Sequence, residues 1–225
     1  MDIPLFPLPN LVLFPQVAVP LHIFEERYKL MINRCIENEE VFGLVLLRTG
    51  AEEERESTIH RVGVTARVVE VDRLQDGRMN ILSAGEMRFR ILRFIGNAPH
   101  WTASVELFED EAEHSELLQA AYAEVAGLYR QSMELTAQLR SVEGSELSLP
   151  ESPVALSYIV SYVLDLDSEK KQLLLETNST LYRLQLLIVH LQENLKQLDL
   201  QIARKNVASR VRGNGDLGMP GSRSV

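Results

Sequence analysis

Apolar residues recur at alternating spacings of three and four near the end of the chain. The positions are Leu181, Leu184, Ile188, Leu191, Leu195, Leu198 and Ile202. This spacing over three heptads is typical of a coiled-coil seam, and it predicts one amphipathic helix over residues 181–202 with an N-cap among residues 178–180. Such a helix is about 33 Å long. Its far seam, Leu191, Leu195, Leu198 and Ile202, is therefore a candidate homodimer contact; packing on helices of the same chain is the alternative.

The preceding 70 residues also show helical periodicity. Leu118, Tyr122, Val125, Tyr129 and Met133 share one helical face. Ser152 followed by Pro153 is typical of a helix start, and a shorter helix is expected from Asp167 or Ser168 to about residue 177. Residues 113–206 are therefore predicted to form an all-helical bundle subdomain.

The first half alternates apolar and polar positions in the manner of strands. Prolines at positions 4, 7, 9, 15 and 20 predict short or edge strands before residue 23, and residues 24–40 fit one helix. Alternation returns in residues 62–68, 78–82, 87–91 and 101–107, with Asp76-Gly77 as a tight turn and a phase change at Leu92 that indicates a bulge. Residues 1–112 are predicted to form a small barrel-like sheet, which makes the chain an α+β protein.

Composition narrows the classes of partner. The 225 residues carry a formal charge of −9, which makes nucleic acid an unexpected main partner, because phosphate binding depends on lysine and arginine. Residues 207–225 are rich in glycine and polar or basic residues, and are predicted to be a disordered tail. No signal peptide or membrane-spanning stretch is recognisable, so we expect a cytoplasmic protein without a membrane partner. Cys35 is the only cysteine and is expected in the core.

Motifs for catalysis are missing from the sequence. No glycine is followed by lysine, so the phosphate-binding loop of ATPases is absent, and no serine stands in GxSxG. Gly213, Gly215 and Gly218 spell GxGxxG, but neither a strand nor a helix flanks them as a dinucleotide site requires. The five histidines never fall at metal-ligand spacing. The sequence therefore predicts no catalytic residues, cofactor or metal, and a protein that is not an enzyme.

Several segments in order resemble one known family. The opening IPLFPLPNLVLFPQVAVPLHIFEERYKLMI, the middle VGVTARVVEVDRLQDGRMNILSAGEMRFRI and the later DSEKKQLLLETNSTLYRLQLLIVHLQENL are similar to the N-terminal, substrate-binding domain of Lon proteases. The resemblance covers roughly residues 3–204 and implies a PUA-like β-barrel followed by a helical bundle. Neither the AAA+ ATPase module nor the serine-lysine peptidase module is present in the sequence, as in stand-alone relatives. Pro9 and Gln16 depart from the arginine and glycine common near those positions in Lon itself.

The resemblance implies a non-catalytic module that binds exposed apolar segments of unfolded or client proteins, and a separate ATP-dependent protease as a further partner. Protein-binding surfaces use large apolar anchors, for which the candidates are Phe6, Phe14, Phe24, Trp101 and Phe108. The alternative for each aromatic residue is a place in the core. The alternative function is a small-ligand or RNA-sensing regulatory module, because PUA-like barrels elsewhere bind such ligands.

Overall fold

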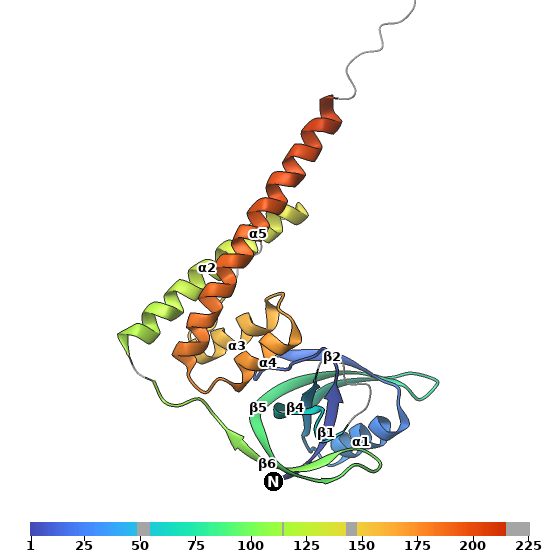
Figure 1. Cartoon of the computed structure of the whole chain (residues 1–225). Helices are drawn as coiled ribbons and strands as arrows, with labels where there is room; N and C mark the ends of the chain where they lie inside the picture. The colour runs from blue at the N-terminus through green and yellow to red at the C-terminus, as the bar shows by residue number, and fades with distance from the viewer. Residues whose placement is uncertain (49–54, 114, 143–147, 215–225) are drawn as a thin grey trace, which may run out of the picture.

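The computed structural model describes residues 1–48, 55–113, 115–142 and 148–214, and the side chains up to residue 207. Within these ranges the chain is an α+β protein with a six-stranded mixed sheet and five helices (Figure 1). The strands are β1 Asp2–Leu8, β2 Ala18–Ile23, β3 Phe42–Leu47, β4 Ile59–Arg73, β5 Met79–Gly96 and β6 Thr102–Phe108. The helices are α1 Glu26–Glu37, α2 Glu116–Arg140, α3 Pro153–Val163, α4 Ser168–Glu176 and α5 Thr180–Asn214.

The sheet has the order β2-β5-β4-β3-β1-β6, and β5 pairs with β6 as well. The first part of β5 pairs with β2 and the later part with β6, so the long strand serves two neighbours along one edge. Strands β1, β3, β4, β5 and β6 thus form a closed circuit of pairings. The α+β class is confirmed, whereas the PUA-like barrel stays a prediction.

Pro4, Pro7 and Pro20 lie in two short strands, as the sequence predicts, and one of these strands is at an edge of the sheet. Pro20 lies in β2, which is an edge strand, but Pro4 and Pro7 lie in β1, which is flanked by β3 and β6. Residues 2–4 of β1 pair with β6 and residues 5–8 pair with β3. Each half of β1 therefore has one paired side, and a proline is accommodated where its missing N–H faces the unpaired side.

The predicted tight turn and the predicted bulge are both present in the sheet. Gly77 has φ +80° between β4 and β5, so the predicted tight turn is confirmed, and register shifts between Ile91 and Arg93 confirm the bulge. Gln16 has φ +64°, a conformation that favours glycine, at the position where the resemblance pointed to a departure. Its N–H donates to the carbonyl of Gly85 at 2.8 Å, so the first corner packs directly on β5.

The helix starts were predictable from their caps. Ser152 Oγ accepts from the N–H of Ala155 at the start of α3, and Asp167 accepts from the N–H of Lys170 at the start of α4. Ser179 accepts from the N–H of Tyr182 at the start of α5. The predicted end of the last helix is wrong, because α5 continues from residue 206 to Asn214. Residues 207–212 contain no glycine or proline, so nothing in them breaks the helix before Gly213. Residues 215–225 of the predicted tail lie outside the described residues.

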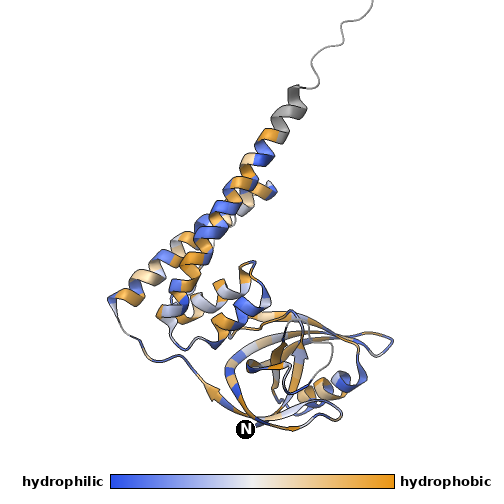
Figure 2. Cartoon of the chain, in the orientation of Figure 1, coloured by the Kyte–Doolittle hydropathy of each residue, from blue (hydrophilic) through white to orange (hydrophobic). Residues whose placement is uncertain are grey.

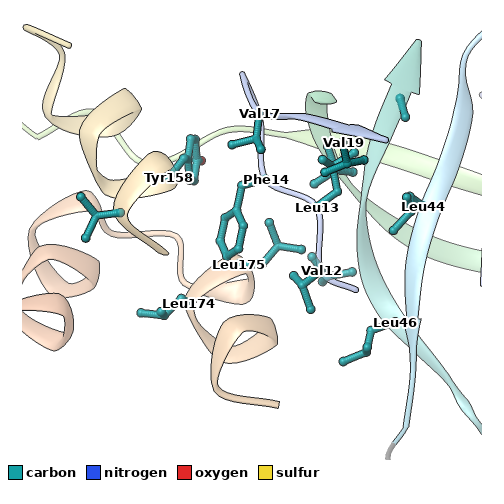
Figure 3. Packing of buried hydrophobic residues seen from close by; sticks show 14 of the residues in the cluster. Val12, Leu13, Phe14, Val17, Val19, Leu44, Leu46, Tyr158, Leu174 and Leu175 are labelled. Carbon is teal, nitrogen blue, oxygen red and sulfur yellow. The ribbon is translucent and has the colours of Figure 1, made fainter. Parts of the chain in front are cut away.

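One apolar core joins the sheet to the helical half. Phe14 lies between Leu13 and Val19 on the sheet side and Tyr158 and Leu175 on the helical side (Figure 3). The same cluster extends to Leu184, Leu187 and Leu191 of α5. A second cluster, around Phe89 and Trp101, is confined to the strands and their flanking residues. The division into subdomains at residues 112 and 113 stays a prediction, and the shared core shows that the two halves are packed together. Cys35 lies in this core, as predicted.

Candidate functional site

The five candidate aromatic anchors do not form one surface. Phe6, Phe14 and Trp101 are buried, Phe108 is half-buried, and Phe24 is 60% exposed. Phe6 packs against Tyr28 with 4.2 Å between ring centroids, and Trp101 packs edge-on against Phe94 at 5.2 Å. Phe6, Phe14 and Trp101 thus have places in the core, which was the alternative. Phe24 stacks on His22 at the surface, far along the chain from Phe108.

Phe108 lines a pocket between the sheet and the helices. The pocket has a volume of about 410 Å³, within the range of ligand sites in proteins. It lies where the end of β6, the connection to α2, and the first turns of α2 and α3 meet β5. Its lining residues form an apolar wall, an acidic rim and a polar floor. We call it the junction pocket.

The apolar wall comes from five elements or loops. Its side chains are Pro15, Met87, Phe108, Leu118, Val154 and Tyr158. Met87, Phe108 and Val154 are half-buried, so parts of their side chains remain accessible from the pocket. An apolar side chain of another protein could cover this exposed apolar area.

The polar floor contains Arg88 and Asp110. Both belong to a buried charge cluster with Arg183, which we call the arginine pair and its aspartate. Arg88 on β5 and Arg183 on α5 each donate to the carboxylate of Asp110, which lies in the connection between β6 and α2. Thr180 also donates to Asp110. The three charged side chains are at most 5% exposed.

One carboxylate cannot balance two buried guanidinium charges, and main-chain carbonyls accept further hydrogen bonds from both arginines. Arg88 Nη1 donates to the carbonyls of Leu175 at 2.9 Å and Thr177 at 2.6 Å, and Arg183 Nη1 donates to that of Thr177 at 2.8 Å. These carbonyls lie at the C-terminus of α4, where the helix dipole is negative. Burial lowers the pKa of Arg88 from its usual value, an effect that the neighbouring Tyr158 and Asp110 partly oppose.

Aromatic rings complete the enclosure of the arginine pair. The Arg183 guanidinium lies 4.3 Å from the centroid of the Tyr158 ring, and the Arg88 guanidinium lies 4.4 Å from that of Phe108. Burial raises the pKa of Tyr158, so its hydroxyl stays protonated at neutral pH. Phe108 therefore has two roles, because one ring covers Arg88 and also lines the junction pocket.

Sequence reasoning missed the charge cluster. Arg88 alternates with Met87 and Phe89, which predicts correctly that it leaves the strand on the other face from Phe89. The helical half covers that face, so Arg88 is buried. Asp110 lies in an acidic run that resembles a solvated loop, and Arg183 lies beside the seam residue Leu184. A lone arginine inside an apolar helical stripe is the one local signal that could have suggested a buried partner.

The candidate self-association residues lie mostly inside the chain. Leu191, Leu195 and Leu198 are buried within the chain, and Ile202 is half-buried. Helices α2 and α5 lie side by side over most of the length of α2, and α5 extends beyond it (Figure 1). Apolar and polar bands alternate along both helices (Figure 2). A homodimer through this seam stays a prediction, and the intrachain packing is the alternative that the structure contains.

Among the described residues, no group of three or more histidine, cysteine, aspartate or glutamate side chains could hold a metal ion. No helix in the described ranges is long and apolar enough to cross a membrane.

Comparison with known proteins gives a consistent result. The model of the ATP-dependent protease La (LON) substrate-binding domain matches residues 2–193. The Lon protease of Anaeromyxobacter dehalogenans is 27% identical over 213 residues, which cover 94% of this chain and 25% of that protein. The Lon protease of Dictyoglomus thermophilum is 23% identical over 198 residues, covering 88% of this chain and 25% of the relative. The chain spans about a quarter of the length of these curated relatives.

Solved structures share the fold. The N-terminal domain of a Mycobacterium avium complex Lon protease has a TM-score of 0.63 and 21% identity, and covers 85% of this chain and 98% of that one. A Lon N-terminal domain protein from Xanthomonas campestris has a TM-score of 0.58 and 22% identity, covering 84% and 98%. The family match extends over most of the described residues of both the sheet and the helical half. This chain belongs to the Lon substrate-binding domain family.

Proposed function

We propose that this chain is a non-catalytic protein-binding module that holds exposed apolar segments of client proteins in the junction pocket. Family membership supports a substrate-binding role, and the observation that carries the location is the half-buried apolar wall of Met87, Phe108 and Val154. The pocket lies beside a rigid floor, because hydrogen bonds and ring contacts hold the arginine pair in place. A preorganised floor of this kind loses little conformational entropy when a ligand binds above it.

The expected affinity is weak. A pocket of about 410 Å³ has room for one or two large side chains, and full burial of one such side chain contributes roughly 1.5–3 kcal/mol. Two such side chains contribute at most about 6 kcal/mol, which corresponds to a dissociation constant of tens of micromolar, and one side chain alone gives a millimolar or weaker constant. Weak binding suits a module that must release its clients. Passing them to a separate ATP-dependent protease is part of the proposal, supported by the Lon protease relatives.

The alternative of a compact polar ligand has less support. A small-ligand site needs polar groups that are free to orient the ligand. On the floor of the pocket, the carboxylate of Asp110 and the Nη atoms of both arginines are engaged within the protein, and the unpaired carboxylates of Glu109 and Glu111 lie at the exposed rim. RNA is disfavoured because the pocket rim is acidic.

A pair of matched substitutions tests the location. Val154→Asp places a carboxylate in the wall near the N-terminus of α3, where the helix dipole tolerates it, and Val189→Asp places the same group on the exposed face of α5. We expect Val154→Asp to weaken binding of a fluorescent peptide with one tryptophan in a glycine-serine host at least about tenfold, because a charge in the wall opposes burial of an apolar side chain. Val189→Asp should bind as wild type does. Fluorescence anisotropy measures both, and equal affinities of the two variants would place the site elsewhere.

The non-catalytic part of the proposal has its own test. The purified chain should neither hydrolyse ATP nor cleave casein or peptides, because the sequence lacks the phosphate-binding loop and a serine in GxSxG. Turnover that co-purifies with the chain through several columns would contradict it.

A further inference from the structure

The rim of the junction pocket carries an excess of negative charge. Its carboxylates are those of Glu86, Glu109, Glu111 and Glu113, whereas Arg88 and Asp110 form an ion pair on the buried floor. Arg88 is 1% exposed and its charge is compensated by Asp110 and main-chain carbonyls. Its buried charge therefore adds little to the field at the mouth of the pocket.

Two of the rim carboxylates are paired with other groups of the chain. Glu86 pairs with Arg67 at 2.5 Å. Glu113 accepts from the hydroxyl of Ser179 at 2.6 Å and from the N–H of Leu181 at 2.8 Å, so it caps α5. These contacts use the two side chains to hold the structure.

Glu109 and Glu111 differ from Glu86 and Glu113 in that their carboxylates have no partner among the described residues. Both are exposed, and neither carboxylate has a hydrogen bond or an ion pair within the described part of the chain. The contact that fixes this segment is made by the main chain, where the N–H of Glu111 donates to the carbonyl of Asn178 at 3.0 Å. The Arg90 guanidinium lies 5.0 Å from the centroid of the Phe108 ring, but Arg90 does not line the pocket. The main chain thus presents two unpaired carboxylates beside an apolar wall.

We infer that the junction pocket selects client segments in which a large apolar residue is flanked by lysine or arginine. The apolar side chain contacts Met87, Phe108 and Val154, and the flanking cation lies near Glu109 and Glu111. Apolar burial supplies affinity for any segment, and charge complementarity at the rim supplies the selection. This inference rests on the proposed function and adds the chemical class of segment to it.

The expected ratio of affinities for differently charged segments follows from the exposed position of the two carboxylates. Exposed carboxylates interact with a nearby cation through a high dielectric, so each adds only a modest factor to the affinity. We expect a peptide with lysine on both sides of one tryptophan to bind about tenfold more tightly than the same peptide with glutamate, at about 50 mM salt. At about 0.5 M salt this ratio should fall below about threefold, because the screening length is then shorter than the distances across the rim.

The experiment compares three peptides and three proteins by fluorescence anisotropy. The peptides carry one tryptophan flanked by lysine, serine or glutamate in a glycine-serine host. The proteins are wild type, Glu109→Gln with Glu111→Gln, and the control Glu124→Gln with Glu134→Gln, which changes the charge equally on exposed positions of α2. Circular dichroism checks that all three are folded. Glutamine retains the Glu111 main-chain contact, so the rim variant should remain folded.

We expect the rim variant, Glu109→Gln with Glu111→Gln, to bind the lysine-flanked peptide only about twofold more tightly than the glutamate-flanked peptide. Its affinity for the serine-flanked peptide should be that of wild type. The control variant should keep the tenfold ratio. Equal binding of the three peptides to wild type would overturn the inference, while a loss of all binding in Val154→Asp would still support the proposed function. If no peptide binds wild type, or Val154→Asp binds normally, the proposed function itself fails.

Discussion

The two ends of the helical half are held in different ways. Near the sheet, α3, α4 and the start of α5 share the apolar core and enclose the arginine pair and its aspartate. At the far end, α2 and α5 form a two-helix pair with one apolar seam, which ends where Lys205 donates to the carbonyl of Leu139 at 2.6 Å. The near end therefore depends on contacts between distant parts of the sequence, and the far end on one periodic pattern. A destabilising substitution at the near end should therefore lower the stability of the whole chain, and one at the far end should promote only local unfolding.

Loss of the Asp110 charge should have the largest effect. Asp110→Asn keeps the size of the side chain but leaves two buried guanidinium groups without a carboxylate, which costs about 3–5 kcal/mol in buried ion pairs. Urea unfolding followed by circular dichroism measures the change. The exposed neighbour Glu109, changed to glutamine, is the control and should stay within about 0.5 kcal/mol of wild type. A loss below about 1 kcal/mol in Asp110→Asn would mean that the main-chain carbonyls suffice to compensate both arginines.

Truncation in the far seam should have a smaller and local effect. Leu195→Ala removes a buried side chain from the contact between α5 and α2, which costs about 2–3 kcal/mol, at the lower end for core leucines because the site lies near the surface. Hydrogen exchange should increase in the later turns of α2 and remain unchanged in the sheet. Leu200→Ala, at an exposed position on the same helix, is the matched control. Faster exchange throughout the sheet would show that the two ends unfold together.

The same seam bears on self-association. With Leu191, Leu195 and Leu198 buried within the chain, a homodimer through them requires α2 to move away. Leu195→Glu with Leu198→Glu should therefore loosen α2 in the hydrogen-exchange experiment while the mass measured by light scattering stays that of wild type. A wild-type dimer at tens of micromolar that the double substitution separates without loss of helix would instead support a contact between chains.

Local patterns were enough to predict the far end but not the near end. Alternating spacings of three and four identified α5, and the side chains of Ser152, Asp167 and Ser179 identified three helix starts, because both signals lie within a few residues. The polar composition after residue 206 is typical of disorder and predicts too early an end for α5, because helix propensity continues and the helix ends at Asn214.

The junction pocket could not be predicted from such patterns. Its lining combines Arg88 of β5 with Tyr158 of α3, and Arg183 of α5 packs on the same Tyr158 ring. The proximity of these three residues depends on how the two halves pack. Aromatic content alone suggested Phe6 and Trp101 as anchors, and these are core residues. Of the five candidates, Phe108 is the one that lines this pocket.

A change in the turn of the sheet tests whether the sheet half depends on its own local geometry. Gly77→Val should cost about 1–2 kcal/mol, because φ +80° is unfavourable for a β-branched residue. Gly96→Val is the control, since Gly96 is not among the residues with positive φ and no atom lies within 4 Å of an added Cβ. The two urea midpoints decide the question, and equal midpoints would mean that the turn adapts to valine.

The smallest expected effect concerns the core beneath α1 and appears only at alkaline pH. Burial, assisted by Glu40, raises the pKa of the Cys35 thiol from 9.0 to about 11 in the folded chain. Below about pH 9 the thiol is protonated in both states, so it adds no pH dependence. Between about pH 9 and 11 the unfolded chain loses this proton while the folded chain keeps it, so the free energy of unfolding falls as the pH rises, by about 1 kcal/mol at pH 10. Urea unfolding at pH 8, 9 and 10 should therefore show a steeper decline for wild type than for Cys35→Ala, in which the titrating group is absent and the other alkaline titrations remain. Parallel declines would mean that the native thiol ionises near its ordinary pKa, and hence that water reaches Cys35 in the folded chain.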